Sequence, residues 1–286
     1  MQFIRHFLLA IQFFTRIPIT GKLADWVGFS PAMLRASAAH FPGVGVVVGL
    51  VAAVIYVALA ALLPDSTFTP LIAAVLSTIA TVLLTGAFHE DGLADVADGL
   101  GGSYDKARAL EIMKDSRVGA FGALALVLAV LAKIALLALL GSVAGTSPSS
   151  FGGWGDIEDS APLLPWANVC SALVAGHVVS RTLALLLVYA LPHVGDSATS
   201  KSKPLADQIS KNSLFVAFVW CFMALALVLW AQAAINLIVA CAAALLALLY
   251  MYRLFKRRLQ GFTGDCLGAA QQVCEIAFYL GLAISL

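Results

Sequence analysis

The sequence predicts an all-helical protein that crosses a membrane about seven times. Of its 286 residues, 61% are hydrophobic and only 12% are charged, about half the charged share of a soluble domain. Seven apolar stretches approach the roughly 20 residues that a bilayer-spanning helix needs, and only every second connection between them contains Lys or Arg. The chain therefore requires a lipid bilayer, and we expect one integral membrane domain over residues 1–286.

Residues 2–16 precede the first span and are predicted to form an amphipathic helix in the membrane interface. Arg5, Gln12 and Arg16 recur along one side of this segment, opposite an apolar side. A helix on the protein surface is the alternative. Because Arg16 and Pro18 follow the short apolar run without a small-residue cleavage site, no removable signal peptide is expected.

The predicted spans follow one another through short connections. In the first of them, Gly45 and Gly49 are four residues apart. Small residues at this spacing favour close approach of a second helix, and a ligand contact is the alternative. The spans are expected near residues 43–63, 69–88, 120–142, 167–191, 213–232, 235–252 and 266–286.

The distribution of basic residues predicts which way the spans point. The N-terminal segment and the connections around residues 89–119, 192–212 and 253–265 contain the Lys and Arg residues that flank the spans, whereas residues 64–68, 142–166 and the turn near Ala233 contain none. The positive-inside rule places the basic connections in the cytoplasm. We therefore expect a multi-pass protein of the cytoplasmic (inner) membrane with a cytoplasmic N-terminus.

Charge and cysteine content exclude other classes of function. The formal net charge is +1 and the 17 Lys and Arg residues are dispersed, so no nucleic-acid partner is expected. The five cysteines lie mostly inside apolar stretches without metal-finger spacing, which is typical of small buried hydrophobic residues.

The segment around residues 89–119 concentrates the charge of the chain. Seven of the 16 acidic residues lie between Glu90 and Asp115, together with four basic residues. At about 2.5 kcal/mol for each of these charges, exposure to hydrocarbon would cost on the order of 25 kcal/mol. The segment must therefore be exposed to water or enclosed by protein.

Three aspartates in this segment predict a metal site. Asp91, Asp95 and Asp98 are spaced by four and three residues, so a helix places all three carboxylates on one face. Their mutual repulsion is offset if a divalent cation binds, and carboxylates that act together with phosphates and waters suit magnesium, with manganese as an alternative. A solvated acidic helix is the other interpretation.

Neighbouring residues suggest a phosphate ligand. Gly101 and Gly102 give space for the close approach of a phosphate. Arg108 and Arg117 are suited to form bidentate hydrogen bonds with its oxygens. Ordinary surface ion pairs are the alternative for the basic residues. Gly264 and Asp265 open the last span, where free backbone N–H groups can attract an anion and Asp265 can meet the metal site.

Several ionisable side chains lie within the predicted spans. Arg181 and Glu275 are functional candidates because charges in a membrane are costly, whereas Lys133 is expected to have buried protein partners. An ion-coupled transporter would also use such groups, but the sequence shows no inverted halves.

Long motifs in this chain resemble those of the cobalamin synthase (adenosylcobinamide-GDP ribazoletransferase) family. They cover residues 88–102 and 110–122, with shorter pieces at residues 13–18, 41–45 and 264–271. The resemblance weakens over residues 193–203. It implies that the 3′-hydroxyl of α-ribazole, or of its 5′-phosphate, attacks adenosylcobinamide-GDP and releases GMP, with magnesium as cofactor.

The resemblance and the residue pattern together predict roles for the site. Asp91, Asp95 and Asp98 are expected to hold magnesium, with Asp265 as a further ligand. Lys114 and Arg117 are expected to bind pyrophosphate oxygens, and Asp115 or His89 to accept the proton of the attacking hydroxyl. Substrate-binding residues are expected to be Arg108, Gly101, Gly102, Gly264 and Arg181.

Other classes of function stay open at this point. A metal-dependent alcohol phosphotransferase of lipid synthesis would also use a stripe of aspartates at the cytoplasmic membrane face, and a transporter or a membrane scaffold would not release GMP. The sequence leaves open whether the chain forms a homo-oligomer or associates with other cobamide-assembly enzymes.

Overall fold

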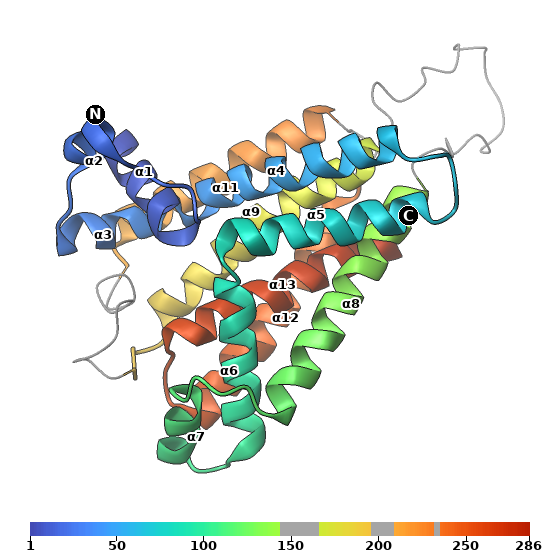
Figure 1. Cartoon of the computed structure of the whole chain (residues 1–286). Helices are drawn as coiled ribbons and strands as arrows, with labels where there is room; N and C mark the ends of the chain where they lie inside the picture. Colours follow the sequence, from blue (N-terminus) through green and yellow to red (C-terminus); the bar gives the residue numbers. More distant parts are fainter. Residues whose placement is uncertain (144–165, 196–208, 232–234) are drawn as a thin grey trace.

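The computed structural model describes residues 1–143, 166–195, 209–231 and 235–286 and shows a bundle of long helices (Figure 1). These ranges contain no β-strand, only an isolated bridge between His193 and Phe262. The predicted connection at residues 142–166, most of the stretch 193–203, and the turn near Ala233 lie largely outside the described residues. The all-helical class predicted from the sequence is confirmed.

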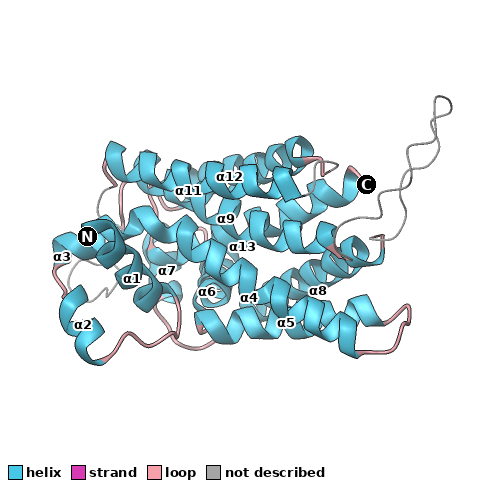
Figure 2. Ribbon diagram, turned by 90° about the horizontal axis from the view of Figure 1, so that it is seen from above, coloured by secondary structure: helices cyan, strands magenta, loops and turns pink. Residues whose placement is uncertain are grey.

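The long helices match the predicted spans. Within the described ranges, six helices are each long and apolar enough to cross a membrane, and α5 joins them if it is counted together with α6. Figure 2 shows α9 and α13 between α11 and α12 on one side and α4, α5 and α8 on the other. The helices are α4 (Phe41–Leu62), α5 (Thr69–Thr85), α8 (Ala120–Ser142), α9 (Ala167–Ala190), α11 (Lys211–Ala231), α12 (Leu237–Arg258) and α13 (Gly264–Ile284).

A sharp bend separates α5 from the helix that carries the acidic residues. Gly86 and Ala87 both adopt left-handed backbone angles, with φ of +67° and +58°, and α6 (Phe88–Gly102) turns by 89° from the direction of α5. A short helix, α7 (Lys106–Met113), follows it. The charged segment therefore leaves the direction of the apolar spans, as Figure 1 shows.

The N-terminal segment folds onto the same end of the bundle. The predicted amphipathic helix is α1 (Gln2–Phe14), followed by α2 (Gly21–Val27), α3 (Pro31–Ser37) and a 3₁₀ turn (Ala38–His40). Leu9, Ile11 and Phe14 are buried on one side of α1, whereas Gln12 is exposed. The backbone N–H of Arg16 donates to the carbonyl oxygen of Leu84 at 2.7 Å, so the end of α1 is tied to the end of α5.

Gly45 and Gly49 bring α4 into close contact with α9, as their spacing predicts. A Cβ atom on Gly49 would lie 2.7 Å from Cα of Val174, and one on Gly45 would lie 2.5 Å from the carbonyl oxygen of His177. Almost all of α9 is buried. Because the neighbouring atoms belong to the backbone, a side chain at either glycine would force the helices apart.

We expect Gly49→Ala to lower the free energy of unfolding by about 1–3 kcal/mol, because overpacking at a tight contact moves the backbone. Unfolding in mixed micelles of increasing SDS fraction measures this change. Gly102→Ala is the matched control, since its new methyl group would meet only the Cδ1 atom of Ile112, at 3.2 Å. Equal stability of the two variants would contradict the close contact between α4 and α9.

Candidate active site

The acidic residues of α6 follow one side of the helix from solvent into the protein. Asp91 is exposed, Asp95 is half-buried and Asp98 is buried. The predicted helix through these residues is confirmed by α6. Their carboxylates are therefore not equivalent, because water reaches Asp91 most easily and Asp98 least.

Asp265, at the start of α13, meets this face of α6. Gly92 permits the contact, since a Cβ atom there would lie 2.7 Å from the carbonyl oxygen of Asp265. The hydroxyl group of Thr263 caps α13 by accepting from the backbone N–H of Cys266 at 3.4 Å, and it lies 3.2 Å from the carboxylate of Asp265. Two helices that are more than 160 residues apart thus bring their acidic residues to one place.

Asp95 experiences the strongest electrostatic effect in this group. Burial raises the pKa of Asp95 to about 7, and repulsion from Asp265, Asp91 and Asp98 adds to the rise. Each of these groups disfavours a further negative charge in partly desolvated surroundings. A cation placed here would relieve that repulsion.

Asp98 has protein partners of its own. Its two carboxylate oxygens accept from the backbone N–H groups of Gly119, at 2.7 Å, and Gly122, at 2.8 Å. These groups belong to the N-terminal end of α8, where a carboxylate satisfies free N–H groups and is favoured by the helix dipole. Asp98 therefore connects α6 to α8, a role that its spacing in the sequence did not indicate.

Removing this connection should weaken the protein. We expect Asp98→Ala to lower the free energy of unfolding by about 1.5–3 kcal/mol, the range for hydrogen bonds to a charged group. Hydrogen exchange of the Gly119 and Gly122 amides should rise in the variant, because both lose their acceptor. Asp105→Ala is a control for the loss of an aspartate at an exposed helix cap. Unchanged exchange at the two glycines would contradict this role.

Arg108 on α7 and Arg117 after it are exposed, and each has an acidic partner. Arg117 forms an ion pair with Asp115 at 2.6 Å, and this guanidinium group holds the pKa of Asp115 at about 2. A carboxylate with so low a pKa is a weak proton acceptor. Arg108 pairs with Glu111 at 2.7 Å on α7, and Lys114 is exposed at the end of that helix.

Gly101, which was predicted to make space for phosphate, and Gly99, two residues before it, both pack closely against neighbouring elements. A Cβ atom on Gly101 would lie 2.6 Å from the ring of Phe121, and one on Gly99 would meet Met113 and the carbonyl oxygen of Ala109. Gly101 and Gly99 thus let α8 and α7 approach α6. Gly264 lines an apolar cavity next to the acidic residues.

His89 is enclosed at the start of α6. Its ring stacks on that of Phe41 with centroids 5.7 Å apart, and only 2% of its surface is exposed. Its Nε2 atom has no hydrogen-bond partner among the described residues. The neighbouring Glu90 accepts a hydrogen bond from the side chain of Gln272 at 3.0 Å, which links α6 to α13 a second time.

Behind His89, the ionisable residues of the spans form one buried network. Glu275 lies 2.6 Å from Lys133 and 3.0 Å from His177, and it also accepts from the hydroxyl group of Tyr279 at 3.0 Å. Arg181 donates to the carbonyl oxygen of His177 at 3.0 Å. The expectation that Lys133 has buried protein partners is confirmed, and the network joins α8, α9 and α13.

The predicted metal site can be compared with the arrangement of these carboxylates. No cage for a metal ion is present among the described residues, because no group of three or more His, Cys, Asp or Glu side chains there could hold one. Magnesium rarely uses such a cage and instead binds one or two carboxylates together with waters and substrate phosphates. Asp91, Asp95 and Asp265 repel one another electrostatically, whereas both oxygens of Asp98 already accept from backbone N–H groups.

Comparisons with known proteins agree over almost the whole chain. The family model described as cobalamin-5-phosphate synthase matches residues 6–283. A protein of Polaromonas sp. (strain JS666 / ATCC BAA-500) named adenosylcobinamide-GDP ribazoletransferase is 69% identical over 100% of this chain and 98% of its own length. Proteins with the same name from Albidiferax ferrireducens and Shewanella piezotolerans are 59% and 40% identical, over 100% and 97% of this chain and 99% and 94% of their own lengths. No solved structure matches.

Proposed function

Because the chain belongs to the cobalamin-5-phosphate synthase family, we propose that its acidic face on α6 is the active site of an adenosylcobinamide-GDP ribazoletransferase. The relatives with this name match the chain from end to end, which supports transferase activity and the assembly of a cobamide. The observation that supports this location is that Asp265 of α13 lies near Asp91 and Asp95 of α6, so that their negative charges repel one another.

The reaction joins an alcohol to a phosphate. The 3′-hydroxyl of α-ribazole, or of its 5′-phosphate, attacks the phosphorus next to cobinamide, and the bond from that phosphorus to the bridging oxygen breaks. GMP leaves with that oxygen, and the proton of the hydroxyl passes to a base. Such transfer depends mainly on positioning and on neutralising charge.

The residues of the site can be assigned to these tasks. Asp91, Asp95 and Asp265 would hold magnesium, and Asp98 would fix α6 against α8 so that Asp95 keeps its position. The bound ion would neutralise phosphate charge during the transfer. Lys114 and Arg117 would contact pyrophosphate oxygens. Arg108, on α7, would also bind substrate. Asp115 or His89 would accept the proton: the ion pair with Arg117 makes Asp115 a weaker base, and His89 is almost fully buried.

The same arrangement supports the orientation that we propose for the protein. The basic C-terminal end of α12 reaches the acidic segment, where Arg258 donates to the carbonyl oxygens of Leu100, at 3.0 Å, and Ser103, at 2.6 Å. Basic and acidic connections therefore share one end of the bundle. We place this end in the cytoplasm of a cell with the protein in its inner membrane, by the positive-inside rule.

One assay tests the reaction and the cofactor together. Purified protein in detergent or proteoliposomes should release GMP from adenosylcobinamide-GDP only when α-ribazole is present, and EDTA should stop the release until magnesium is returned. A CDP-linked lipid donor serves as the control for a lipid phosphotransferase. GMP release that is unaffected by EDTA would contradict the metal assignment, whereas uptake of the donor without GMP release would identify a transporter.

A further inference from the structure

A small polar cavity lies inside the bundle, behind the first turn of α6. Its volume is about 10 Å³, which is room for about one water molecule. Side chains from α4, α5, α6, α8, α9 and α13 line it. Polar members of this lining include Thr85, Glu90, Lys133, His177, Arg181 and Glu275. The cavity is therefore suited to a water molecule and too small for either substrate.

Many of the lining groups already have partners within the protein. The hydroxyl groups of Thr81 and Thr85 donate to carbonyl oxygens of their own helix, at 2.8 and 3.0 Å. Lys133 pairs with Glu275 at 2.6 Å. The amide group of Gln272 donates to a carboxylate oxygen on α6 at 3.0 Å. None of these groups needs a further ligand.

Four other lining side chains each have a buried atom that lacks a hydrogen-bond partner. Among the described residues, these atoms are Nε2 of His89, Oε2 of Glu90, Nε2 of His177 and Nε of Arg181. A buried polar atom without a partner is costly, and ordered water commonly satisfies such atoms where a polar cavity has room for it.

The hydrogen-bonding capacities of three of these atoms match one water molecule. Nε of Arg181 can only donate and Oε2 of Glu90 accepts. Nδ1 of His177 lies 3.0 Å from a carboxylate oxygen of Glu275, so the proton of the neutral ring belongs on Nδ1 and Nε2 accepts. A single water can accept from Arg181 and donate to the other two residues.

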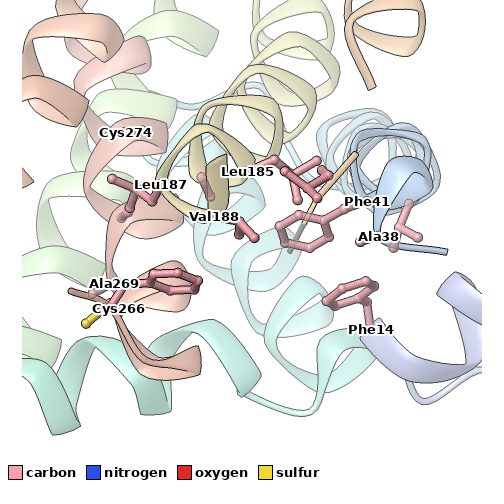
Figure 3. Packing of buried hydrophobic residues seen from close by; sticks show 14 of the residues in the cluster. Phe14, Ala38, Phe41, Leu185, Leu187, Val188, Cys266, Ala269 and Cys274 are labelled. Atoms are coloured by element: carbon pink, nitrogen blue, oxygen red, sulfur yellow. The ribbon is translucent and has the colours of Figure 1, made fainter. Parts of the chain in front are cut away.

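Arg181 also needs a counter-ion. Only 1% of its surface is exposed, and among the described residues it forms no ion pair. Its guanidinium group lies over the ring of Phe41, 5.5 Å from the centroid. Figure 3 shows Phe41 and Leu185, which follows Arg181 by one turn of α9, among apolar side chains. A charge in such surroundings is normally paired.

Glu90 is the carboxylate that is free to balance this charge. Glu275 and Glu90 both attract Arg181 electrostatically. Glu275 already contacts Lys133, at 2.6 Å, and His177, at 3.0 Å. Glu90 accepts from the protein through one oxygen, while the other is buried and has no partner among the described residues.

We propose that Glu90 is the counter-ion of Arg181 and that one ordered water in the polar cavity bridges the two side chains and His177. Glu90 immediately precedes Asp91 in the first turn of α6, so the bridge holds this turn against α9. Glu90 is thus a positioning residue for the acidic face and not a metal ligand, and Arg181 binds the acidic helix instead of substrate. The positioning role rests on the proposed function, because it concerns the metal site assigned there.

A pair of substitutions tests the charge pair without turnover. Glu90→Gln should raise the equilibrium constant for unfolding in SDS mixed micelles by about tenfold or more, because it leaves Arg181 without its counter-ion. In a protein that already carries Arg181→Met, the same substitution should have no effect or should stabilise. An equal effect of Glu90→Gln in both proteins would overturn the pair.

Glu111→Gln is the matched control for this measurement. Glu111 pairs with Arg108 at the exposed surface of α7, so the loss of its charge should change the unfolding constant by less than about fivefold. An effect as large as that of Glu90→Gln would show that burial of the pair is not the cause, and would overturn the proposal.

A high-resolution structure of the unaltered protein tests the water directly, even if a variant does not fold. Density for one ordered water is expected within hydrogen-bonding distance of Nε of Arg181 and Oε2 of Glu90. An empty cavity, or a Glu90 side chain that points to solvent, would overturn the proposal.

Binding of Mn²⁺, followed by electron paramagnetic resonance, separates a positioning role from a ligand role. Glu90→Gln and Arg181→Met should each weaken Mn²⁺ binding by about tenfold, the usual effect of losing a residue that supports a metal ligand. Weakening by Glu90→Gln alone, or by neither, would overturn the positioning role. If the unaltered protein binds no Mn²⁺, the proposed metal site is refuted, whereas the unfolding data still decide the charge pair.

Discussion

Asp95→Asn should reduce the rate of GMP release by about three orders of magnitude or more, because it removes several kcal/mol of charge stabilisation from the transfer. Asp95 occupies the centre of the acidic group, where Asp91, Asp98 and Asp265 all act on it. An amide keeps the shape of the side chain but cannot supply the negative charge that attracts a cation. The variant should therefore lose activity without losing its fold.

The same experiment separates a catalytic defect from a folding defect. Membrane insertion should match that of the unaltered protein, and resistance to unfolding in SDS should be equal or greater, because the substitution relieves repulsion between carboxylates. Asp65→Asn is the control, since Asp65 is exposed in the connection between α4 and α5. Activity of Asp95→Asn near normal at saturating magnesium would refute the metal site.

Glu275→Ala should lower the free energy of unfolding by about 3–5 kcal/mol, because it leaves a buried positive charge without its partner. Lys133, at 2.6 Å, is only 3% exposed and would lie in an apolar environment. His177 and Tyr279 would lose the same acceptor. Unfolding in SDS measures the change, and the variant should also yield less folded protein in the membrane.

Two further variants identify the cause of that loss. Lys133→Met combined with Glu275→Leu should recover most of the stability, since apolar residues can replace a buried ion pair. Glu111→Ala removes an acidic partner from Arg108 at the exposed surface of α7 and should cost less than about 1 kcal/mol. A double variant no more stable than Glu275→Ala would show that the other hydrogen bonds of Glu275 dominate.

Local patterns in the sequence predicted the helices well. Apolar length located the spans, and α8 begins and ends within a residue of its predicted range. Spacing alone placed Asp91, Asp95 and Asp98 on one helix and indicated the close contact at Gly45 and Gly49. Each of these properties depends on residues three or four positions apart, which is the spacing at which side chains share one face of an α-helix.

Contacts between distant segments could not be predicted in this way. The two amides that bind Asp98 are backbone groups, which no side-chain pattern reveals. The sequence marked Arg181 and Glu275 as unusual, but it did not show that Glu275 binds Lys133, which is 142 residues away along the chain. Nor did it show that the phenylalanines of three motifs surround one cavity. The roles of Lys114, Arg117 and Gly264 remain predictions.

The 89° bend before α6 depends on a contact with the N-terminal segment. The bend is stabilised from outside, because Arg16, at the end of α1, donates its backbone N–H to Leu84 just before Gly86. A contact with residues far earlier in the chain thus supports the bend. Activity should therefore depend on this contact, because the direction of α6 decides whether Asp95 faces Asp265.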